Sequence, residues 1–131
     1  MDRKSQFQFT RPELKSISFR INEEFDTAEK EREIEANISV DVNKHKEKPY
    51  AHVELTVSIG TQKNNDPYTI QATEMSDFRW DETVDDDTSD RFLNVNAPSF
   101  LLSYLRPIIA SITSSSSYGT YNIPMINFTR N

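Results

Sequence analysis

The sequence contains no cysteine, only two glycines and no long apolar run. Without cysteine there can be neither a disulfide framework nor a thiolate metal site, and an intracellular location is the simpler expectation. Two glycines cannot supply a glycine-rich loop that cradles phosphate. Because the first residues lack an apolar segment and no run is long enough to span a bilayer, we expect a cytoplasmic protein with no signal peptide or membrane helix.

Positive charge is also scarce. Fifteen Lys and Arg residues stand against 21 Asp and Glu, which gives a net charge of −6, and the basic residues do not cluster. Such a chain repels nucleic acid and anionic membranes, so we expect neither as a partner. A length of 131 residues suffices for one hydrophobic core, and aromatic residues at 11% argue against disorder. We therefore expect a single folded domain over residues 1–131.

No catalytic signature is present. His45 and His52 have no second histidine or cysteine at ligand spacing, which predicts two surface imidazoles. The serine run 114–117 beside Gly119 is typical of a loop, and no neighbouring base would activate a nucleophile. We therefore predict a protein that is not an enzyme and that binds neither a cofactor nor a metal.

One segment concentrates negative charge. Six carboxylates lie within ten residues: Asp81, Glu82, Asp85, Asp86, Asp87 and Asp90. A calcium loop is one interpretation, but the spacing lacks the central glycine and terminal glutamate of an EF-hand. We expect a solvated loop instead, in which Asp85 to Asp87 cap a short helix towards Phe92 and Leu93.

Alternation of apolar and polar residues predicts strands in the first 80 residues. The segments are 7–9, 17–21, 34–42, 51–59 and a run from Tyr68 that extends towards Trp80. Short polar connections favour an antiparallel meander. Because each strand has one polar face, we expect a single sheet that is covered on only one side.

One amphipathic helix is available to cover that side. Pro98 suits a first helical turn, and apolar residues then recur at helical spacing, at Leu101, Tyr104, Leu105, Ile108 and Ile112. Pro107 lies inside this pattern and should kink the helix or split it after about two turns. The serine run and Gly119 end the helix, and residues 123–128 are expected to form a short strand or an extended closing segment.

Two motifs in the last third resemble the SecB family of bacterial protein-export chaperones. The first is Asn96-Ala97-Pro98-Ser99-Phe100-Leu101-Leu102-Ser103-Tyr104-Leu105-Arg106, and the second, after Ile112-Thr113 and a Ser/Gly break, is Pro124-Met125-Ile126-Asn127-Phe128. In the family a Pro, an apolar pair, a Tyr and an Arg open the main helix, and a Pro-Ile-Asn-Phe-like motif closes the core. Ile17-Ser18-Phe19 is similar to the family's first-strand motif, and the two long strands follow in the family's order.

The resemblance implies an α+β fold, with a four-stranded antiparallel sheet of Greek-key character and one long and one short helix packed on one face. It also implies a homo-oligomer, a dimer of dimers, in which strands and helices of neighbouring subunits pack together. The implied function is that of a chaperone in protein transport and folding, which holds unfolded or precursor polypeptides.

In the family, non-native clients lie in apolar grooves between helix and sheet and around the connecting loops. The positions of this chain that match such places are Phe25, Phe78, Trp80, Leu101, Leu105, Tyr118 and Tyr121. Phe25 and Trp80, which charged residues flank, are expected to be exposed. An alternative stays open for Phe78, Trp80 and the two leucines, since these side chains could instead form the sheet–helix core.

Other positions depart from the family pattern. Those matching the family's acidic contacts with the SecA translocase motor are Ser16, Arg20, Thr69 and Gln71, and none of them is acidic. The chain ends at Asn131, where the family continues with a last helix and a SecA-binding tail. We therefore do not expect delivery of precursors to SecA.

Two functions remain. One is a SecB-like holdase, including one with a dedicated client such as an antitoxin. The other is a non-enzymatic interaction or scaffold protein that binds a folded partner through the sheet or through the acidic segment 81–90. Native-state binding of a hydrophobic dye and suppression of aggregation separate the two.

Overall fold

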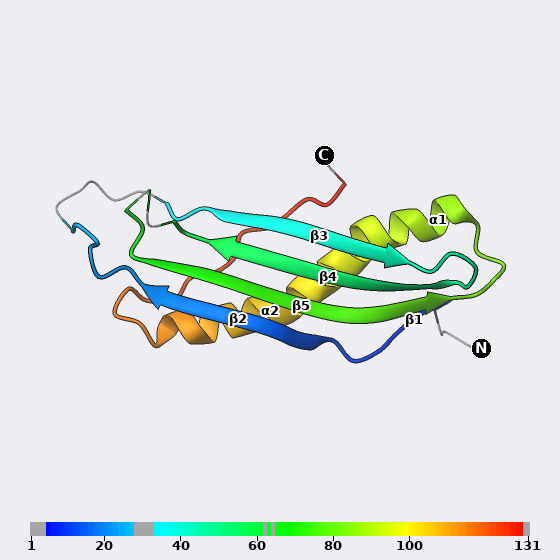
Figure 1. Ribbon diagram of the computed structural model, residues 1–131, viewed down its shortest axis with the longest axis horizontal. Helices are drawn as coiled ribbons and strands as arrows, with labels where there is room; N and C mark the ends of the chain where they lie inside the picture. Colours follow the sequence, from blue (N-terminus) through cyan, green and yellow to red (C-terminus); the bar gives the residue numbers. More distant parts are fainter. Residues whose placement is uncertain (1–4, 28–32, 62, 64, 130–131) are drawn as a thin grey trace.

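The computed structural model describes residues 5–27, 33–61, 63 and 65–129. Five strands form one antiparallel sheet: β1 (Phe7–Phe9), β2 (Glu13–Ile21), β3 (Ala36–Lys44), β4 (Tyr50–Ile59) and β5 (Tyr68–Trp80). A helical run follows, consisting of α1 (Asp86–Arg91), the π-helical turn η1 (Phe92–Asn96) and α2 (Ala97–Ser114). The sheet forms one layer and α2 crosses behind it (Figure 1).

β1 and β2 share one position in the sheet. Both pair with β5 on the side away from β4, with Phe7 opposite Trp80 and Glu13 opposite Met75. The sheet is therefore four positions wide, in the order β1 and β2, β5, β4, β3. Hairpins join β3, β4 and β5, and the N-terminal strand returns beside β5, which is a Greek-key arrangement. The sheet that the family resemblance implies is confirmed, with its first strand divided in two, whereas the meander that the strand pattern favours is wrong, because β2 pairs with β5 and not with β3.

The division lies between Phe9 and Glu13. Pro12 has no backbone N–H to give to a ladder, and the register shifts between Leu14 and Ser16, so that Lys15 is an extra residue in β2. This edge of the sheet is consequently interrupted between Phe9 and Glu13 and bulged at Lys15.

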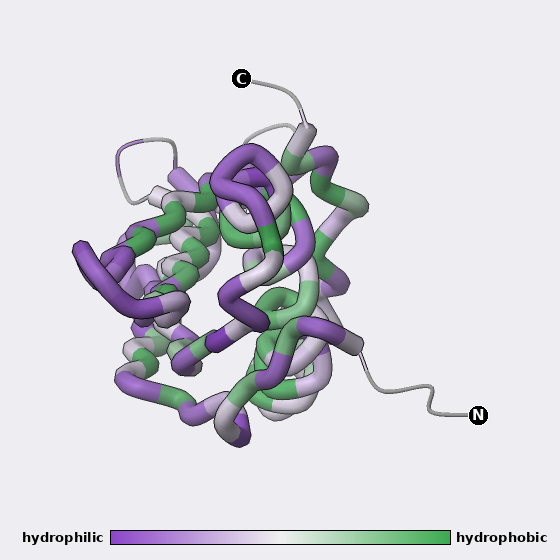
Figure 2. Tube along the Cα trace, turned by 90° about the vertical axis from the view of Figure 1, so that its right-hand side faces the viewer, coloured by the Kyte–Doolittle hydropathy of each residue, from purple (hydrophilic) through white to green (hydrophobic). Residues whose placement is uncertain are grey.

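The core lies between the sheet and α2. One face of β4 is fully buried, through Ala51, Val53, Leu55, Val57 and Ile59. These side chains belong to one apolar cluster with Leu101, Leu105 and Ile109 of α2. The view along the molecule shows the alternation of hydrophobic and hydrophilic residues along the strands (Figure 2). A sheet covered on one side, as the alternation predicts, is confirmed.

α2 passes through Pro107 without interruption, so of the two expected effects, a kink or a split, the split is wrong. Pro107 cannot bond to the carbonyl of Ser103, but both residues are exposed, so that carbonyl faces water. Leu105 and Ile109 are fully buried on the opposite side of the helix. Their burial stabilises the helical backbone on both sides of the proline.

The short helix of the acidic segment is confirmed. The Asp85 carboxylate caps α1 by accepting a hydrogen bond from the Thr88 N–H at 2.7 Å. α1 leads directly through η1 into α2, so the helical run begins at Asp86, well before Pro98. After α2, residues 119–127 form neither a helix nor a strand, although Ile123 is buried.

Candidate functional site

The two motifs that carry the family resemblance contact each other through Arg106. Its guanidinium donates hydrogen bonds to the carbonyl of Ile123 and, at 2.9 Å, to the carbonyl of Pro124. The arginine of the helix motif thus holds the segment that leads into Pro124-Met125-Ile126-Asn127-Phe128. The sequence shows both motifs but gives no signal that this side chain joins them.

Aromatic rings gather where the chain leaves α2 and passes the far end of the sheet. Phe25 meets Tyr118 edge to face at 5.6 Å between ring centroids, and Tyr118 lies 6.1 Å from Tyr68. Phe19 completes this set, 5.5 Å from Tyr68. Phe25 is half-buried and Tyr118 is 41% exposed. We call Phe19, Phe25, Tyr68 and Tyr118 the end cluster.

Tyr121 lies beyond the end cluster and is fixed at two points. Its N–H donates to the Thr113 hydroxyl at 2.8 Å, and its own hydroxyl donates to the Ile34 carbonyl at 3.1 Å. Three of the sequence-predicted groove residues, Phe25, Tyr118 and Tyr121, therefore lie on the segments that flank this end of the molecule, with part of each side chain open to solvent.

Trp80 and Phe78 lie towards the other end of the sheet, in the apolar cluster. Trp80 is only 8% exposed, so the expectation of an exposed Trp80 is wrong. Phe7 of β1 pairs opposite it, and the Lys44 ammonium lies 5.8 Å from its ring centroid on another side. Phe78 is 2% exposed and contacts Phe92 and Phe100 edge to face.

Leu101 and Leu105 are fully buried within the core. Together with Phe78 and Trp80, they belong to the apolar cluster between α2 and the sheet. The seven groove candidates thus separate into a buried group of four and a more accessible group of three at the opposite end.

Sequence reasoning missed a set of exposed apolar side chains along the divided edge. We call this set the apolar rim: Phe9 of β1, Leu14 and Ile21 of β2, and Tyr104 of α2. Phe9 is 54% exposed even though its ring lies 4.5 Å from that of Phe100. The rim exists because α2 does not reach the edge strand along its whole length, which strand periodicity cannot reveal.

Glu74 is a buried carboxylate on the helix-facing side of β5. It lies opposite Leu14 on one neighbouring strand and Leu55 on the other, and its Oε1 has no hydrogen-bond partner among the described residues. Burial raises the pKa of Glu74. The sequence does carry this signal, because Glu74 has the same phase as Ile70 and Ala72, both of which point inward.

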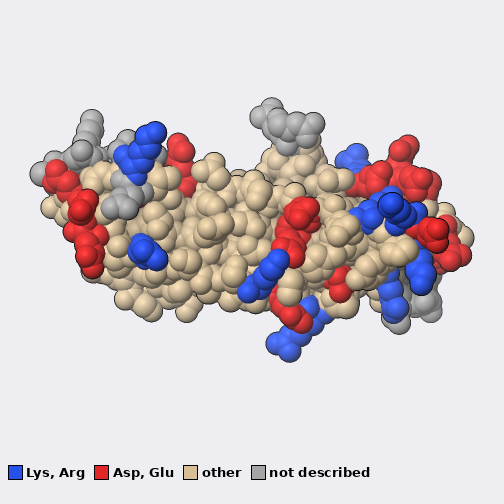
Figure 3. Space-filling model, viewed as in Figure 1, with Lys and Arg blue, Asp and Glu red and all other residues tan. Residues whose placement is uncertain are grey.

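The outer face of the sheet carries a connected polar network. His52 bonds through Nδ1 to Asp77 at 2.7 Å and through Nε2 to Glu54 at 2.9 Å, and Lys15 donates to Glu54 at 2.9 Å. The hydrogen bond with Asp77, then that with Glu54, raises the pKa of His52. The bonds from Lys15 and His52 lower the pKa of the Glu54 carboxyl. Away from this network, much of the sheet face is uncharged (Figure 3).

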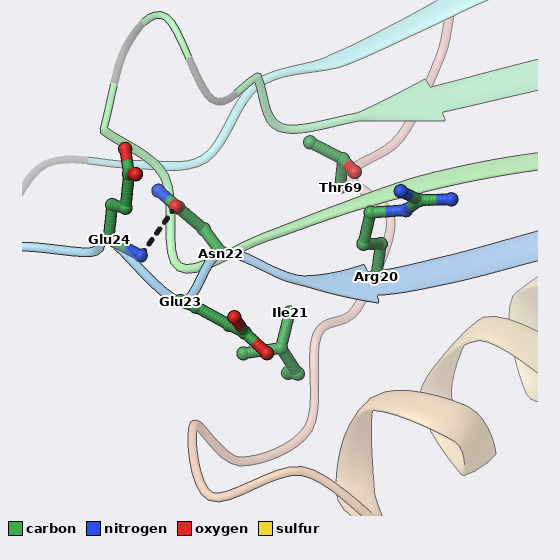
Figure 4. A pocket seen from close by; sticks show the side chains of 6 residues that line it. All are labelled: Arg20, Ile21, Asn22, Glu23, Glu24 and Thr69. Atoms are coloured by element: carbon green, nitrogen blue, oxygen red, sulfur yellow. Dashed lines mark hydrogen bonds between the residues drawn. The ribbon is translucent and has the colours of Figure 1, made fainter.

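The four positions that replace the family's acidic contacts all lie on the outer face of β2 and β5. Arg20 is opposite Thr69, and Gln71 is opposite Ser18, two residues from Ser16. Arg20 and Thr69 line a shallow pocket of about 390 Å³ with residues 21–24, and the Arg20 side chain extends over β5 (Figure 4). Arg20 is the charged residue among these four positions, and Glu23 and Glu24 line the same pocket.

Four of the six carboxylates in the acidic segment have partners within the protein, namely Asp81, Asp85, Asp86 and Asp90. Asp81 accepts hydrogen bonds from the backbone and the hydroxyl of Thr83, which lower the pKa of its carboxyl. Lys44 of β3 donates to Asp90 at 2.9 Å and lies 3.9 Å from Asp86. In the part of the chain that the structure describes, no three carboxylates or imidazoles come together as a metal site. No helix there is long and apolar enough to cross a membrane.

A one-sided antiparallel sheet, a helical layer and an open apolar rim define an α+β protein with exposed apolar side chains along one sheet edge. The family model described as "Preprotein translocase subunit SecB" matches residues 1–130, and the chain belongs to the SecB family. No curated protein sequence matches the chain.

One solved structure agrees on the fold. The Mycobacterium tuberculosis Rv1957 SecB-like chaperone, in complex with a ChAD peptide from the Rv1956 HigA1 antitoxin, is similar with a TM-score of 0.70 at 12% identity, over 93% of this chain and 88% of that chain. A Streptococcus agalactiae protein of unknown function has a TM-score of 0.48 at 9% identity, over 91% and 97% of the two chains. The first likeness supports the SecB-like fold and the second carries no argument.

Proposed function

We propose that the protein is a cytoplasmic, single-domain SecB-like holdase that keeps non-native polypeptides from aggregating. The observation that supports this most is SecB family membership over residues 1–130, joined with apolar side chains that are open to solvent at both ends of the molecule. Burial of each apolar side chain of a client contributes roughly 1.5 to 3 kcal/mol without demanding a particular shape, and several weak contacts add through avidity.

In this proposal the client groove keeps the residues that the family resemblance assigns. Phe25, Tyr118 and Tyr121 are its accessible part. The four buried candidates lie in the core beneath the groove: Phe78, Trp80, Leu101 and Leu105. In this proposal a client contacts them only where α2 and the sheet separate. The rings of the end cluster suit this use because they present apolar area with few rotatable bonds.

The proposed assembly is a homo-oligomer, a dimer of dimers. The apolar rim supports it, since exposed apolar side chains along a strand edge and a helix suit contact with a second copy. A dedicated client is also part of the proposal, because the similar Rv1957 chaperone is in complex with a peptide from an antitoxin. Delivery to SecA is not proposed, since Arg20 would repel a basic partner surface.

A non-enzymatic scaffold that binds a folded partner is the second candidate. The observation that favours it is the network of Lys15, Glu54, His52 and Asp77, which fixes polar side chains on the outer sheet face. A rigid polar face suits a folded partner better than an unfolded one.

Aggregation of a chemically denatured test enzyme distinguishes the two. The holdase should suppress light scattering at about one tetramer per client and bind a hydrophobic dye in its native state, whereas a scaffold should do neither. Replacing Phe25 and Tyr118 together by Ala should reduce the suppression several-fold. Tyr50→Ala is the matched control, because Tyr50 is similarly exposed but lies outside the end cluster. Unchanged suppression in the double variant would refute the groove assignment.

A further inference from the structure

Phe25, one of the accessible groove candidates, lies outside every strand and helix. It belongs to the connection 22–27, which follows β2 at the end of the sheet opposite α1 (Figure 1). Its ring meets that of Tyr118 edge to face at 5.6 Å between centroids and is only half-buried. Because no strand ladder fixes the backbone of this connection, other hydrogen bonds must hold the ring in its place.

Asn22, which is buried, supplies the hydrogen bonds at the start of the connection. Its side-chain oxygen accepts from the Glu24 N–H at 3.0 Å, as Figure 4 shows, and its backbone carbonyl accepts from the Phe25 N–H at 3.1 Å. These two bonds close a turn that ends at Phe25. The N–H and the Nδ2 of Asn22 donate to the carbonyls of Pro67 and Asp66, each at 2.9 Å. Asn22 therefore joins this turn to the loop between β4 and β5.

The loop between β4 and β5 is closed by its own hydrogen bonds. The Asp66 carboxylate accepts from the Thr61 N–H at 2.7 Å, and the Asp66 N–H donates to the Thr61 carbonyl at 3.2 Å. Gly60 begins the loop with a φ of 75°, and a Cβ at this position would collide with the Tyr68 carbonyl oxygen. The loop is therefore a fixed support for the connection that bonds to it.

Asn65 attaches the connection to the same loop at a second place. Its side-chain oxygen accepts from the Asp26 N–H at 3.0 Å, and its Nδ2 donates to the Asp26 carbonyl at 3.2 Å. Asn65 has a φ of 55°, a left-handed conformation that asparagine adopts more readily than most residues. Since Asn22 lies before Phe25 and Asp26 after it, the backbone of Phe25 is attached to the loop on both sides.

We propose that Asn22 and Asn65 are positioning residues for client binding, because they hold the Phe25 ring against Tyr118 from the loop between β4 and β5. The inference rests on the proposed holdase function and names the residues that prepare its accessible end for a client. Both asparagines act through Phe25. A ring that is already in place loses less conformational entropy when an apolar client side chain packs on it, so the client binds more tightly.

A double-mutant cycle between Asn22 and Phe25 tests the proposal on client affinity. The probe is a fluorescein-labelled peptide of about ten residues that alternates Leu and Ser, and its binding is followed by fluorescence anisotropy. Asn22→Ala and Phe25→Ala should each weaken binding about fivefold, and the double variant should bind as weakly as Phe25→Ala alone. A loss in the double variant equal to the product of the two single losses would show that Asn22 does not act through Phe25, and would overturn the proposal.

The contact between the two rings gives a second measurement, which needs no client. Nuclear Overhauser contacts between the rings of Phe25 and Tyr118 should be lost in Asn22→Ala. Asn94→Ala is the matched control, because Asn94 also donates a side-chain hydrogen bond to an aspartate carbonyl, that of Asp90 at 2.7 Å, but belongs to η1. This control should keep both the ring contacts and the affinity for the probe.

Asn65→Gly decides if Asn22→Ala does not fold. Glycine keeps the left-handed backbone of this position and removes both bonds to Asp26. The variant should weaken binding of the probe about threefold, and it should cause no further loss when Phe25 is already replaced by Ala.

The proposal is overturned if Asn22→Ala keeps the ring contacts, or if it loses them and still binds the probe with unchanged affinity. Either result, in a protein that suppresses aggregation, would refute the positioning role and leave the holdase function standing. If the unmodified protein neither binds the probe nor suppresses aggregation, while Asn22→Ala loses the ring contacts, Asn22 positions Phe25 and the holdase function is refuted.

Discussion

Glu74 shows how one side chain can oppose the stability of the fold that contains it. The folded protein raises the pKa of this carboxyl through burial, so its charged form destabilises the fold at pH values above the folded-state pKa. This destabilisation disappears below the unfolded-state pKa, which is about 4.3 for glutamate. Stability therefore rises as the pH falls through the interval between the two values.

Glu74→Gln should accordingly raise the melting temperature at pH 7, and the gain should vanish at a pH of about 3.5, where the carboxyl is neutral in both states. Thermal unfolding at the two pH values measures the difference. Glu54→Gln is the control, because it weakens the bonds from Lys15 and His52 and should lower the melting temperature at pH 7. An equal gain at both pH values would show that the effect is not electrostatic.

The burial of a single residue could be predicted where it follows from the alternation of apolar and polar residues along a strand. Val53, Leu55 and Val57 alternate with polar residues, and they are buried as the pattern requires. Trp80 shares the phase of Ile70 and Ala72, so the alternation places it on the inner face, but it does not show what covers the ring. Its charged neighbours in the sequence point elsewhere, and its burial depends on Phe7, which reaches it only through the pairing of β1 with β5.

At the scale of elements, α2 carries an interior proline that the fold tolerates. Pro107 removes one helical hydrogen bond on the exposed side, and in a helix interior proline is about 3 kcal/mol less favourable than alanine. Pro107→Ala should raise the free energy of unfolding by about 2 kcal/mol, after allowance for the freer unfolded chain. Urea denaturation measures it. Pro98→Ala should give no gain, because Pro98 is fully buried and its replacement leaves a cavity, and a loss of stability in Pro107→Ala would contradict this account.

Strands and helices with a strong hydrophobic period could be predicted from the sequence. Whether a proline divides such an element could not. The strands from residue 36 onwards match the alternation closely. The sequence signals the interruption at Pro12, but whether β1 and β2 occupy one sheet position or two depends on which edge of β5 they meet. The continuity of α2 through Pro107 depends on burial of Leu105 and Ile109 against the sheet, which is a tertiary effect.

At the scale of the whole molecule, the two SecB-like motifs predicted the fold better than they predicted which side chains are exposed. The helix motif and the closing motif lie where the resemblance requires, and Arg106 joins them. The candidate groove could be predicted only in part. Leu101 and Leu105 recur at a helical spacing that fits a core and a groove equally well. Phe9 and Tyr104 are exposed because of the place where α2 crosses the sheet, which the sequence does not show.

The position of β5 between β4 and the divided edge also sets the order in which the sheet can assemble. β5 meets β4 through a short connection, with Ile59 opposite Ile70, whereas Ile17 must find Ala72 across most of the preceding chain. Because closing a longer loop costs more entropy, β3, β4 and β5 should pair before β2 joins them. Pulse-labelled hydrogen exchange during refolding would detect this order, and earlier protection of β2 would contradict it.

During synthesis β1 and β2 leave the ribosome well before β5, and they must wait as unpaired strands. A regular strand in that state could pair with other nascent chains. The proline and the extra residue that divide this edge therefore protect the chain at a time when its own sheet does not yet exist.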